Sequence, residues 1–269
     1  MTILKRKRWV INMKRSYKAL IFGIFLSVIG IILMASTAVF AYNDYKNYDK
    51  FKEGTLELTE DLDYSFEVSA GTVNFFKTEN TSHVDYKIID LYEVKLNDKT
   101  VTVGSKRKFF SFGFLAYKNV VNVYLNENIS DNNCQIKLSA GKINMNDDFE
   151  FESLKITVSA GELLAEKIVA NDKLDITMSA GDMKISDSKT DKLDVKLSAG
   201  DIDLKSDFNS LDFKISAGDF DLDAYGTEAD YTIDVKVSAG NSNARNGGSG
   251  EKKIKGSLSA GDFTIKYLG

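Results

Sequence analysis

Apolar and polar residues alternate along most of the chain, and the alternation changes phase at a recurring point. Residues 193–199 place Leu, Val, Leu and Ala at alternate positions, and after Gly200 the apolar positions move by one, to Ile202 and Leu204. A period of two is typical of a β-strand with one buried face. The change of phase indicates a turn or bulge at a position where glycine is comfortable.

The tripeptide Ser-Ala-Gly marks this change of phase eight times. It occupies residues 69–71, 139–141, 159–161, 179–181, 198–200, 216–218, 238–240 and 259–261, and successive members of the last seven are 18 to 22 residues apart. A period of this size indicates a solenoid of stacked coils. We therefore predict an all-β fold, a β-helix or β-solenoid of ~20-residue rungs. We expect Ala to point inward at each corner and Gly to turn the chain.

Outward positions repeat as well. Aspartate recurs at one position of the coil and lysine or threonine recurs two residues later: Asp175, Asp194, Asp212 and Asp234, then Thr177, Lys196, Lys214 and Lys236. Neighbouring coils of a parallel stack lie ~4.8 Å apart. We therefore expect an acidic ladder beside a basic ladder, with ion pairs running diagonally from coil to coil.

Residues 77–133 interrupt the regular repeat. Residues 84–88, 99–103 and 120–125 are rich in Val, Ile, Tyr and Thr and predict strands. We expect this insert to form a larger coil between the first rung and the regular rungs over 134–269. The aromatic residues of 109–114 fit a hairpin tip, a loop, or a part of the core or its cap.

Residues 19–41 form an uncharged, apolar segment of 23 residues. At ~1.5 Å per residue such a helix crosses the ~30 Å hydrocarbon core of a bilayer. The flanking basic residues all precede it, so the segment predicts a cytoplasmic basic tail over 1–18 and a chain that lies outside the membrane afterwards. We assign 42–57 to a linker and 58–269 to the extracytoplasmic solenoid. A signal peptide cleaved after Ala41 is the alternative, and it would release a secreted protein.

Charge is distributed unevenly between the two parts. Residues 1–41 carry seven Lys and Arg and no acid, whereas the remainder carries 28 basic and 39 acidic side chains. An acidic body with only two arginines, Arg107 and Arg245, does not suit nucleic acid. One cysteine, Cys134, excludes a disulfide within the chain and a cysteine-based metal site. We expect membrane lipid around 19–41 and no nucleic acid as a partner.

The repeated pattern Leu-x-Val-x-x-Ser-Ala-Gly-Asp-x-x-Leu and the strand over 121–125 resemble a bacterial family often labelled putative adhesin, whose function is unknown and whose members are membrane-anchored in Gram-positive bacteria. The resemblance covers about 55–269, although Asn126 stands where the family usually has proline. It implies a β-helical fold. Some members lie in cell-envelope-stress operons beside Lia-type signalling components. The family offers no catalytic residues to carry over.

Candidate chemistry is sparse. Asp182, Asp201 and Asp219 follow the corner glycine in successive coils, so stacked carboxylates could attract a divalent cation, or they could form a solvated turn face. His83 has no identifiable catalytic partner, and Cys134 occupies an inward position that predicts a core side chain. We predict no cofactor and no enzymatic activity.

These observations favour a membrane-anchored extracytoplasmic module that acts through its surface, in the cell-envelope stress response or in adhesion. Its partner would be an envelope protein or a cell-wall polymer. Two alternatives remain: a carbohydrate-binding or carbohydrate-active β-helix, and a self-assembling surface scaffold. The second would form homo-oligomers through the ends of the solenoid, where the last rung over 263–269 would leave an open sheet edge.

Overall fold

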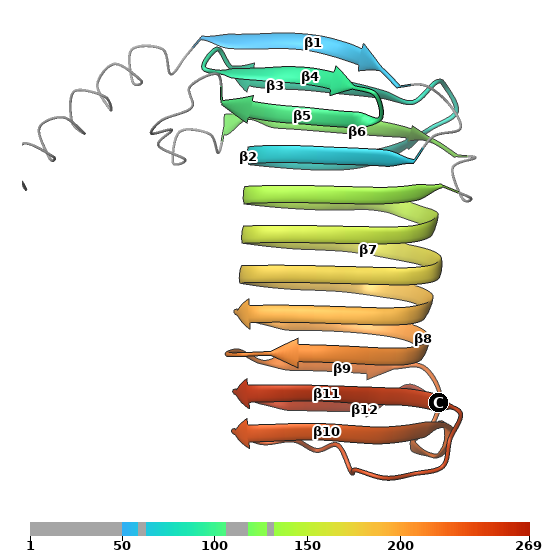
Figure 1. Cartoon of the computed structure of the whole chain (residues 1–269). Helices are drawn as coiled ribbons and strands as arrows, with labels where there is room; N and C mark the ends of the chain where they lie inside the picture. Colours follow the sequence, from blue (N-terminus) through green and yellow to red (C-terminus); the bar gives the residue numbers. More distant parts are fainter. Residues whose placement is uncertain (1–49, 59–62, 106–117, 128–131) are drawn as a thin grey trace, which may run out of the picture. The chain divides into compact units, whose positions relative to one another are not determined.

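The structure is a computed structural model that describes residues 50–58, 63–105, 118–127 and 132–269. The predicted tail, the predicted membrane segment over 19–41 and the aromatic cluster over 109–114 lie outside these residues. No helix within the described ranges is long and apolar enough to span a membrane. The described residues form a stack of coils, seen from the side in Figure 1.

The described elements are almost all strands, which confirms the all-β prediction. They are β1 (Phe51–Glu57), β2 (Tyr64–Thr78), β3 (His83–Ile89), β4 (Tyr92–Asn97), β5 (Thr100–Ser105), β6 (Val120–Asn126), β7 (Asn133–Ala199), β8 (Ile202–Ile215), β9 (Phe220–Ala224), a single 3-10 turn over Glu228–Asp230, β10 (Tyr231–Ala239), β11 (Lys252–Ala260) and β12 (Phe263–Tyr267). The great length of β7 reflects ladder hydrogen bonds that continue around the corners of several coils (Figure 1).

Each coil contributes one strand before its Ser-Ala-Gly corner and one strand after it. Coils pair in parallel and in register, so that Leu193 lies beside Leu211 and Leu197 beside Ile215. The alternate apolar side chains point inward and form one continuous buried core. The phase shift read in the sequence is therefore a real corner at which the core-facing positions change.

Glycine is required at the corner for two reasons. Gly181 has φ of +121°, and a Cβ atom placed there would lie 1.7 Å from the carbonyl oxygen of Gly161 in the preceding coil. The expected inward Ala is wrong for most coils. Ala70 is buried and Ala140 is half-buried, whereas the six other triplet alanines are exposed: Ala160, Ala180, Ala199, Ala217, Ala239 and Ala260. The inward alternation therefore ends before the alanine in these coils, as at Leu197, which is buried, and Ala199, which is exposed.

Contrary to the prediction, the insert over 77–133 does not lie between the first rung and the regular rungs. Rung one stacks directly on the regular array, because Tyr64 of β2 pairs with Cys134 of β7. The other edge of β2 pairs with β5 and β6, so the insert caps the N-terminal end of the solenoid instead of separating two rungs. The predicted strands of the insert are present as β3, β5 and β6, and β4 adds an antiparallel edge to β5.

Part of the predicted linker belongs to this cap. Residues 51–57 form β1, which pairs antiparallel with β3, and β3 in turn pairs antiparallel with β6. Sequence reasoning missed β1 because its residues lack both the period-two alternation and the repeat motif, with large apolar side chains only at Phe51 and Leu56. The strand gains its partner only when β3 folds back over the first rung.

The last two coils stack in reverse chain order. β11 lies between β8 and β10, so the chain forms the terminal coil first and then returns to fill the gap (Figure 1). Its return also changes the predicted aspartate ladder, because Lys255 now separates Asp212 from Asp234. Gly256 lies beneath the ring of Phe213, where a Cβ atom would approach the ring carbons to 2.2 Å. The missing side chain lets β11 fit beside β8.

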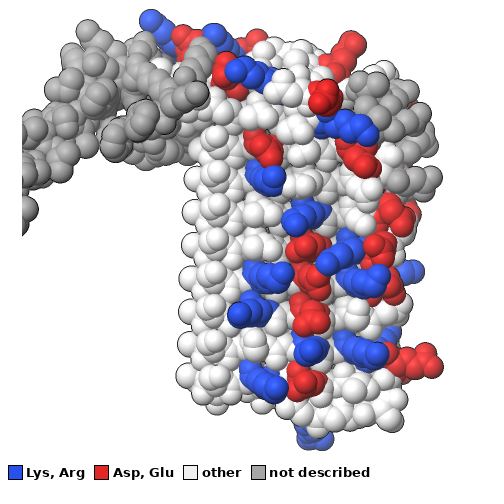
Figure 2. Space-filling view, in the orientation of Figure 1, with Lys and Arg blue, Asp and Glu red and all other residues white. Residues whose placement is uncertain are grey.

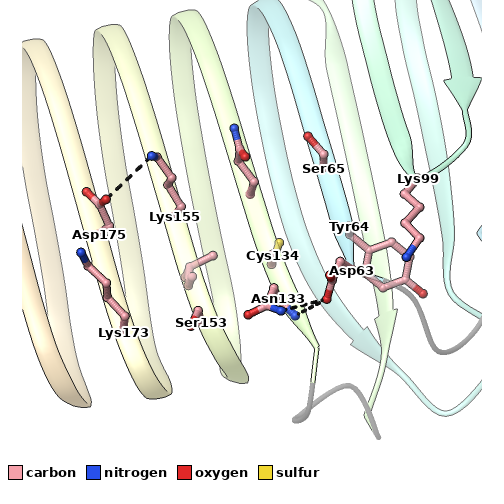
Figure 3. A pocket seen from close by; sticks show the side chains of 12 residues that line it. Asp63, Tyr64, Ser65, Lys99, Asn133, Cys134, Ser153, Lys155, Lys173 and Asp175 are labelled. Atoms are coloured by element: carbon pink, nitrogen blue, oxygen red, sulfur yellow. Dashed lines mark hydrogen bonds and ion pairs between the residues drawn. The ribbon is translucent and has the colours of Figure 1, made fainter.

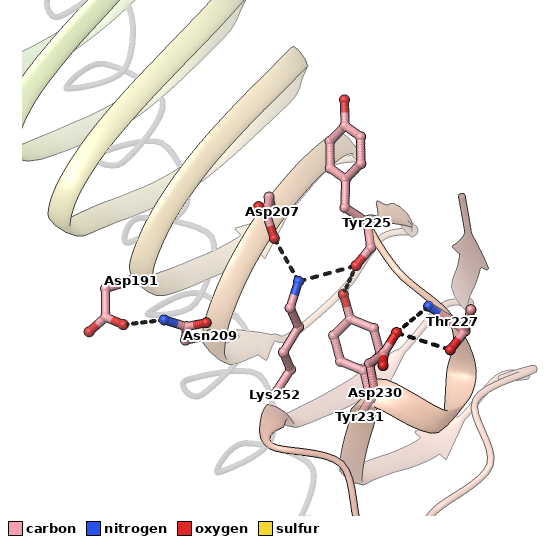
Figure 4. A network of polar contacts seen from close by, with 8 residues as sticks. All are labelled: Asp191, Asp207, Asn209, Tyr225, Thr227, Asp230, Tyr231 and Lys252. Carbon is pink, nitrogen blue, oxygen red and sulfur yellow. Dashed lines mark hydrogen bonds and ion pairs between the residues drawn. The ribbon is translucent and has the colours of Figure 1, made fainter. Parts of the chain in front are cut away.

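A polar network stabilises the place where the chain returns to insert β11 between β8 and β10, which we call the C-terminal crossing (Figure 4). Lys252, at the start of β11, donates to Asp207 at 2.6 Å and to the carbonyl of Tyr225 at 3.3 Å. The Tyr231 hydroxyl, at the start of β10, donates to the same carbonyl at 2.5 Å. Both out-of-order strands are thus anchored at their first residues to the coil that precedes them.

The expected open edge at the C-terminal end is wrong. The loop over 241–250 covers it, and two asparagine side chains replace a further strand. Asn246 accepts from the backbone N–H of Val235 and donates to its carbonyl, both at 2.8 Å. Asn243 likewise accepts from the backbone N–H of Ile265 in β12 and donates to its carbonyl, both at 2.8 Å. Each amide satisfies both backbone groups of one edge residue, which a neighbouring strand would otherwise do.

Candidate functional site

One concave feature of the described residues is a groove on the sheet that precedes the corners (Figure 3). We call it the coil-start groove, because it runs across the first residues of the strands in four successive coils. It has a volume of about 450 Å³. Its lining consists of Asp63, Tyr64, Ser65, Lys99, Asn133, Cys134, Gln135, Ser153, Leu154, Lys155, Lys173 and Asp175.

The groove exists because outward side chains are short in the first coils. Two rows of outward positions border it, and in coils one to three these rows carry mainly Ser65, Gln135, Asn133 and Ser153. Farther along, the same rows carry charged pairs; Lys192, for example, bonds Asp172 at 2.9 Å. The floor is formed by the strands at Tyr64, Cys134 and Leu154, whose side chains are buried in the core.

Lysines stand at both ends of the coil-start groove. Figure 3 shows Lys99 at one end and Lys155 and Lys173 at the other. Lys155 lies 3.8 Å from Asp175, and Lys173 forms an ion pair with Asp194 of the next coil. The hydrogen bond to Asp194 raises the pKa of Lys173 despite some desolvation, so this lysine stays protonated at neutral pH. Lys99 makes no ion pair with any residue in the described part of the chain.

Cys134 is confirmed as a core residue. Its side chain is buried, and desolvation, together with the nearby Asp63 carboxylate, raises the pKa of the thiol far above its usual range. Because the thiolate is the reactive form, this cysteine is a poor nucleophile. Asp63 itself accepts hydrogen bonds from the backbone and the side chain of Asn133, at 2.9 and 3.1 Å.

The aspartates considered as metal ligands form a hydrogen-bonded ladder. Asp182 accepts from the backbone N–H of Asp201, and Asp201 accepts from that of Asp219, at 3.3 and 3.0 Å. The ladder continues through Asp262 to Asn241, each at 2.8 Å. One oxygen of each carboxylate therefore bonds the next corner. In the described ranges, no group of three or more His, Cys, Asp and Glu is arranged to hold a metal ion.

His83 lies in an aromatic stack. Its ring is 4.6 Å from that of Tyr124, and Tyr124 is 5.2 Å from Phe76 on the neighbouring strand. The rings face one another, at interplanar angles of 12° and 24°. The stack strengthens the N-terminal sheet, and Nδ1 of His83 lies 3.0 Å from the carbonyl oxygen of Thr81.

The predicted charge ladders are present on the same sheet as the groove (Figure 2). Asp194 lies beside Asp212, and Lys196 beside Lys214. The diagonal pairs form differently from the prediction, because Asp194 bonds Lys173, on the other side of the acidic column. Lys196, Lys214 and Lys236 make no ion pair with a described residue.

A comparison with protein-family models identifies the family to which this chain belongs. The Toastrack family model (Toastrack DUF4097) matches residues 64–268, which span rung one, the insert and every regular coil. The chain belongs to the Toastrack family. The match confirms the resemblance to putative adhesins that the repeated corner motif suggested. Among proteins with curated functions, none matches this Toastrack chain.

The chain is similar to the solved structures of three bacterial proteins named putative adhesins. One from Parabacteroides merdae is 15% identical, with a TM-score of 0.48, and the alignment covers 80% of this chain and 96% of that one. One from Bacteroides fragilis is 13% identical, with a TM-score of 0.48 and coverages of 81% and 98%. One from Parabacteroides distasonis is 14% identical, with a TM-score of 0.44 and coverages of 81% and 97%.

Sequence reasoning did not find the coil-start groove. A signal was nevertheless available, because alignment of the rungs shows Ser, Asn and Gln at outward positions that carry Asp and Lys in later coils. Lys99 could not be placed in this way. It reaches the groove only because the insert folds onto the free edge of rung one, where the carbonyl of Lys99 accepts from the N–H of Ser65 at 3.1 Å.

Proposed function

We propose that this Toastrack protein is a membrane-anchored extracytoplasmic interaction module, which holds a rigid solenoid at the cell envelope and acts by binding. Adhesion and the sensing of envelope stress both require such a module. The coil-start groove carries the proposal, because it is a concave, partly apolar surface with polar groups along its rim. A rigid stack presents such a groove in one fixed shape, which limits the entropy lost on binding.

Binding is favoured over catalysis by the contents of the groove. Lys173 remains cationic, the Cys134 thiol is buried and protonated, and Asp63 accepts hydrogen bonds from Asn133. No residue lining the groove pairs a nucleophile with a base, which is the arrangement that hydrolytic mechanisms use. The alternative of a carbohydrate-active β-helix therefore has a surface to start from but lacks its chemistry in the described residues.

Self-assembly through the C-terminal end has less support than lateral binding. The two asparagine clamps occupy the edge that a second copy would need. The opposite end carries charged side chains on its outer strands, including Lys52, Glu53 and Lys95, and charge on an edge strand discourages pairing with another sheet. The sides of the stack, which include the groove, are thus the better interaction surface.

Two measurements on the full chain in a Gram-positive host test the proposal. A C-terminal tag should be removed by protease added to intact cells, while the remaining protein stays in the membrane fraction after a high-salt wash. A photo-crosslinking residue at Gln135, inside the groove, should capture envelope material that the same residue at Lys236 does not. Release of the whole protein into the medium would contradict the anchor, and turnover of an envelope glycan would contradict a binding-only role.

A further inference from the structure

We propose that the coil-start groove binds a segment of acidic polysaccharide that lies along the solenoid axis. The inference deepens the proposed function by naming the chemical class of its partner. The groove crosses four coils, and at ~4.8 Å per coil it extends roughly 14 Å from the first to the fourth. An extended chain ligand fits this shape better than a compact metabolite does, because the groove is long and open along one side.

The middle of the groove suits a polyhydroxylated ligand. Ser65, Asn133, Gln135 and Ser153 offer hydroxyl and amide groups that both donate and accept hydrogen bonds. Between these rows lies the strand backbone at Tyr64 and Leu154, whose side chains are buried in the core. The hydroxyl groups along a sugar chain both donate and accept hydrogen bonds, so a polysaccharide would use this polar middle of the groove.

The ends of the groove select for acidic groups. Lys99 is exposed and makes no ion pair with a described residue, and Lys155 lies 3.8 Å from Asp175, which leaves room for a closer anion. The two acids in the lining are less available to repel a ligand. Asp63 accepts two hydrogen bonds from Asn133, and Asp175 lies between Lys155 and Lys173. Carboxylate and phosphate groups are the anions that lysine binds in polysaccharides of this kind.

The rest of the surface does not offer this combination. The Lys196 and Lys214 column stands directly beside the Asp194 and Asp212 column, so an anion there would meet carboxylates at close range. The sheet that follows the corners carries the hydrogen-bonded aspartate ladder from Asp182 onward. The acidic body therefore repels anions generally, whereas the groove, among the described residues, has lysines at both ends and a middle whose carboxylate, Asp63, is hydrogen-bonded by Asn133.

Equilibrium binding to the full chain in detergent micelles tests this inference, with three ligands. Oligogalacturonate is an acidic polysaccharide, poly(glycerol phosphate) carries anionic phosphates but no sugar rings, and fully methyl-esterified oligogalacturonate keeps the sugar backbone without its charge. We expect oligogalacturonate to bind more tightly than either of the other two ligands, and tighter binding of poly(glycerol phosphate) would count against a polysaccharide. Masking the charge should weaken binding of the galacturonate by about tenfold or more, the effect of losing a charge-assisted contact.

Variants locate the site. Lys99→Gln and Lys173→Gln should each weaken binding of the acidic ligand by about tenfold. Lys236→Gln, on the same sheet but in the terminal coil, should leave it unchanged. Equal binding of the acidic and esterified ligands, equal losses from Lys99→Gln and Lys236→Gln, or no binding of either acidic ligand would overturn the inference. Crosslinking from Gln135 would in those cases still support a groove with another partner, so the two proposals fail separately.

Discussion

The middle coils and the C-terminal coil differ in what satisfies the backbone hydrogen-bonding groups along the edges of their strands. In the middle, each strand has a parallel neighbour on both sides, and each corner glycine packs against the glycine of the coil before it. At the end, a neighbour is missing, and single asparagine side chains replace it at Val235 and Ile265. The middle is therefore held by repetition of backbone contacts, whereas the end depends on a few particular side chains.

This difference has a consequence for tolerance to substitution. A change at a corner in the middle is transmitted to two neighbouring coils, because backbone atoms of adjacent corners are in direct contact. A change in the terminal loop leaves the regular ladder intact and alters only the last edge. The same kind of substitution should therefore lower stability by different amounts in the two regions.

The largest difference should separate two glycines with similar backbone angles. Gly181→Ala places a Cβ atom 1.7 Å from the Gly161 carbonyl oxygen, and we expect a loss of stability of more than about 4 kcal/mol, or failure to fold. Gly247 has φ of +117°, but a Cβ atom placed there would meet nothing within 4 Å. Gly247→Ala should therefore lower stability only through backbone strain, by about 1–2 kcal/mol. Thermal and urea unfolding followed by circular dichroism measures both. Equal losses would show that the contact between corners is unimportant.

The asparagine clamps should produce the next largest effect. Asn246→Ala leaves the N–H and the carbonyl of Val235 without this partner and should lower stability by about 1–3 kcal/mol. It should also promote concentration-dependent association through the exposed edge, which sedimentation velocity would detect. Asn144→Ala is the matched control, because it removes a side-chain bond to Asn74 of 2.7 Å and uncovers no backbone edge. Association by both variants alike would argue against a capping role.

Tyr231 should make the C-terminal crossing sensitive to alkali. Desolvation, followed by the Asp207 carboxylate, raises the pKa of its hydroxyl, so the folded state keeps the proton that the unfolded chain loses near pH 10. The corresponding stability is complete below about pH 10 and is lost as the pH rises toward the folded-state pKa. Tyr231→Phe should lose about 1 kcal/mol at neutral pH, from the bond to Tyr225, and decline less steeply above pH 10. Parallel alkaline titrations of the two proteins test this.

The smallest effect should come from Asp230 beside the crossing. Hydrogen bonds from the Thr227 backbone N–H and then from its hydroxyl lower the pKa of this carboxyl. Its contribution is therefore present above the unfolded value of about 3.9 and is lost as the pH falls through the lower folded-state pKa. Asp230→Asn should flatten the acid side of the curve of melting temperature against pH, and Thr227→Val should flatten it partly. Identical acid profiles for the wild type and Asp230→Asn would contradict the role of this cap.

The coil-start groove shows where prediction from sequence reached its limit. The periodic positions of Ser153, Lys155 and Lys173 could be read from the rung alignment, because coils in register bring equivalent positions together. Lys99 belongs to the insert, whose strands carry no repeat and pair with rung one through long-range contacts. The four coils of the groove were therefore accessible from the sequence, and its cationic end at Lys99 was not.

The sequence alone determined the solenoid, its corner glycines and the inward-facing residues of its strands apart from the corner alanines, because period-two alternation and a repeat of about 20 residues act locally in every coil. The tertiary structure decided the side on which the insert lies, the reversed order of the last two coils and the way each end is closed. Near-identical coils offer nearly equivalent edges, so local pattern does not choose among them. Contacts between distant residues make that choice, as when Gly256 fits beneath Phe213 and Lys252 bonds Asp207.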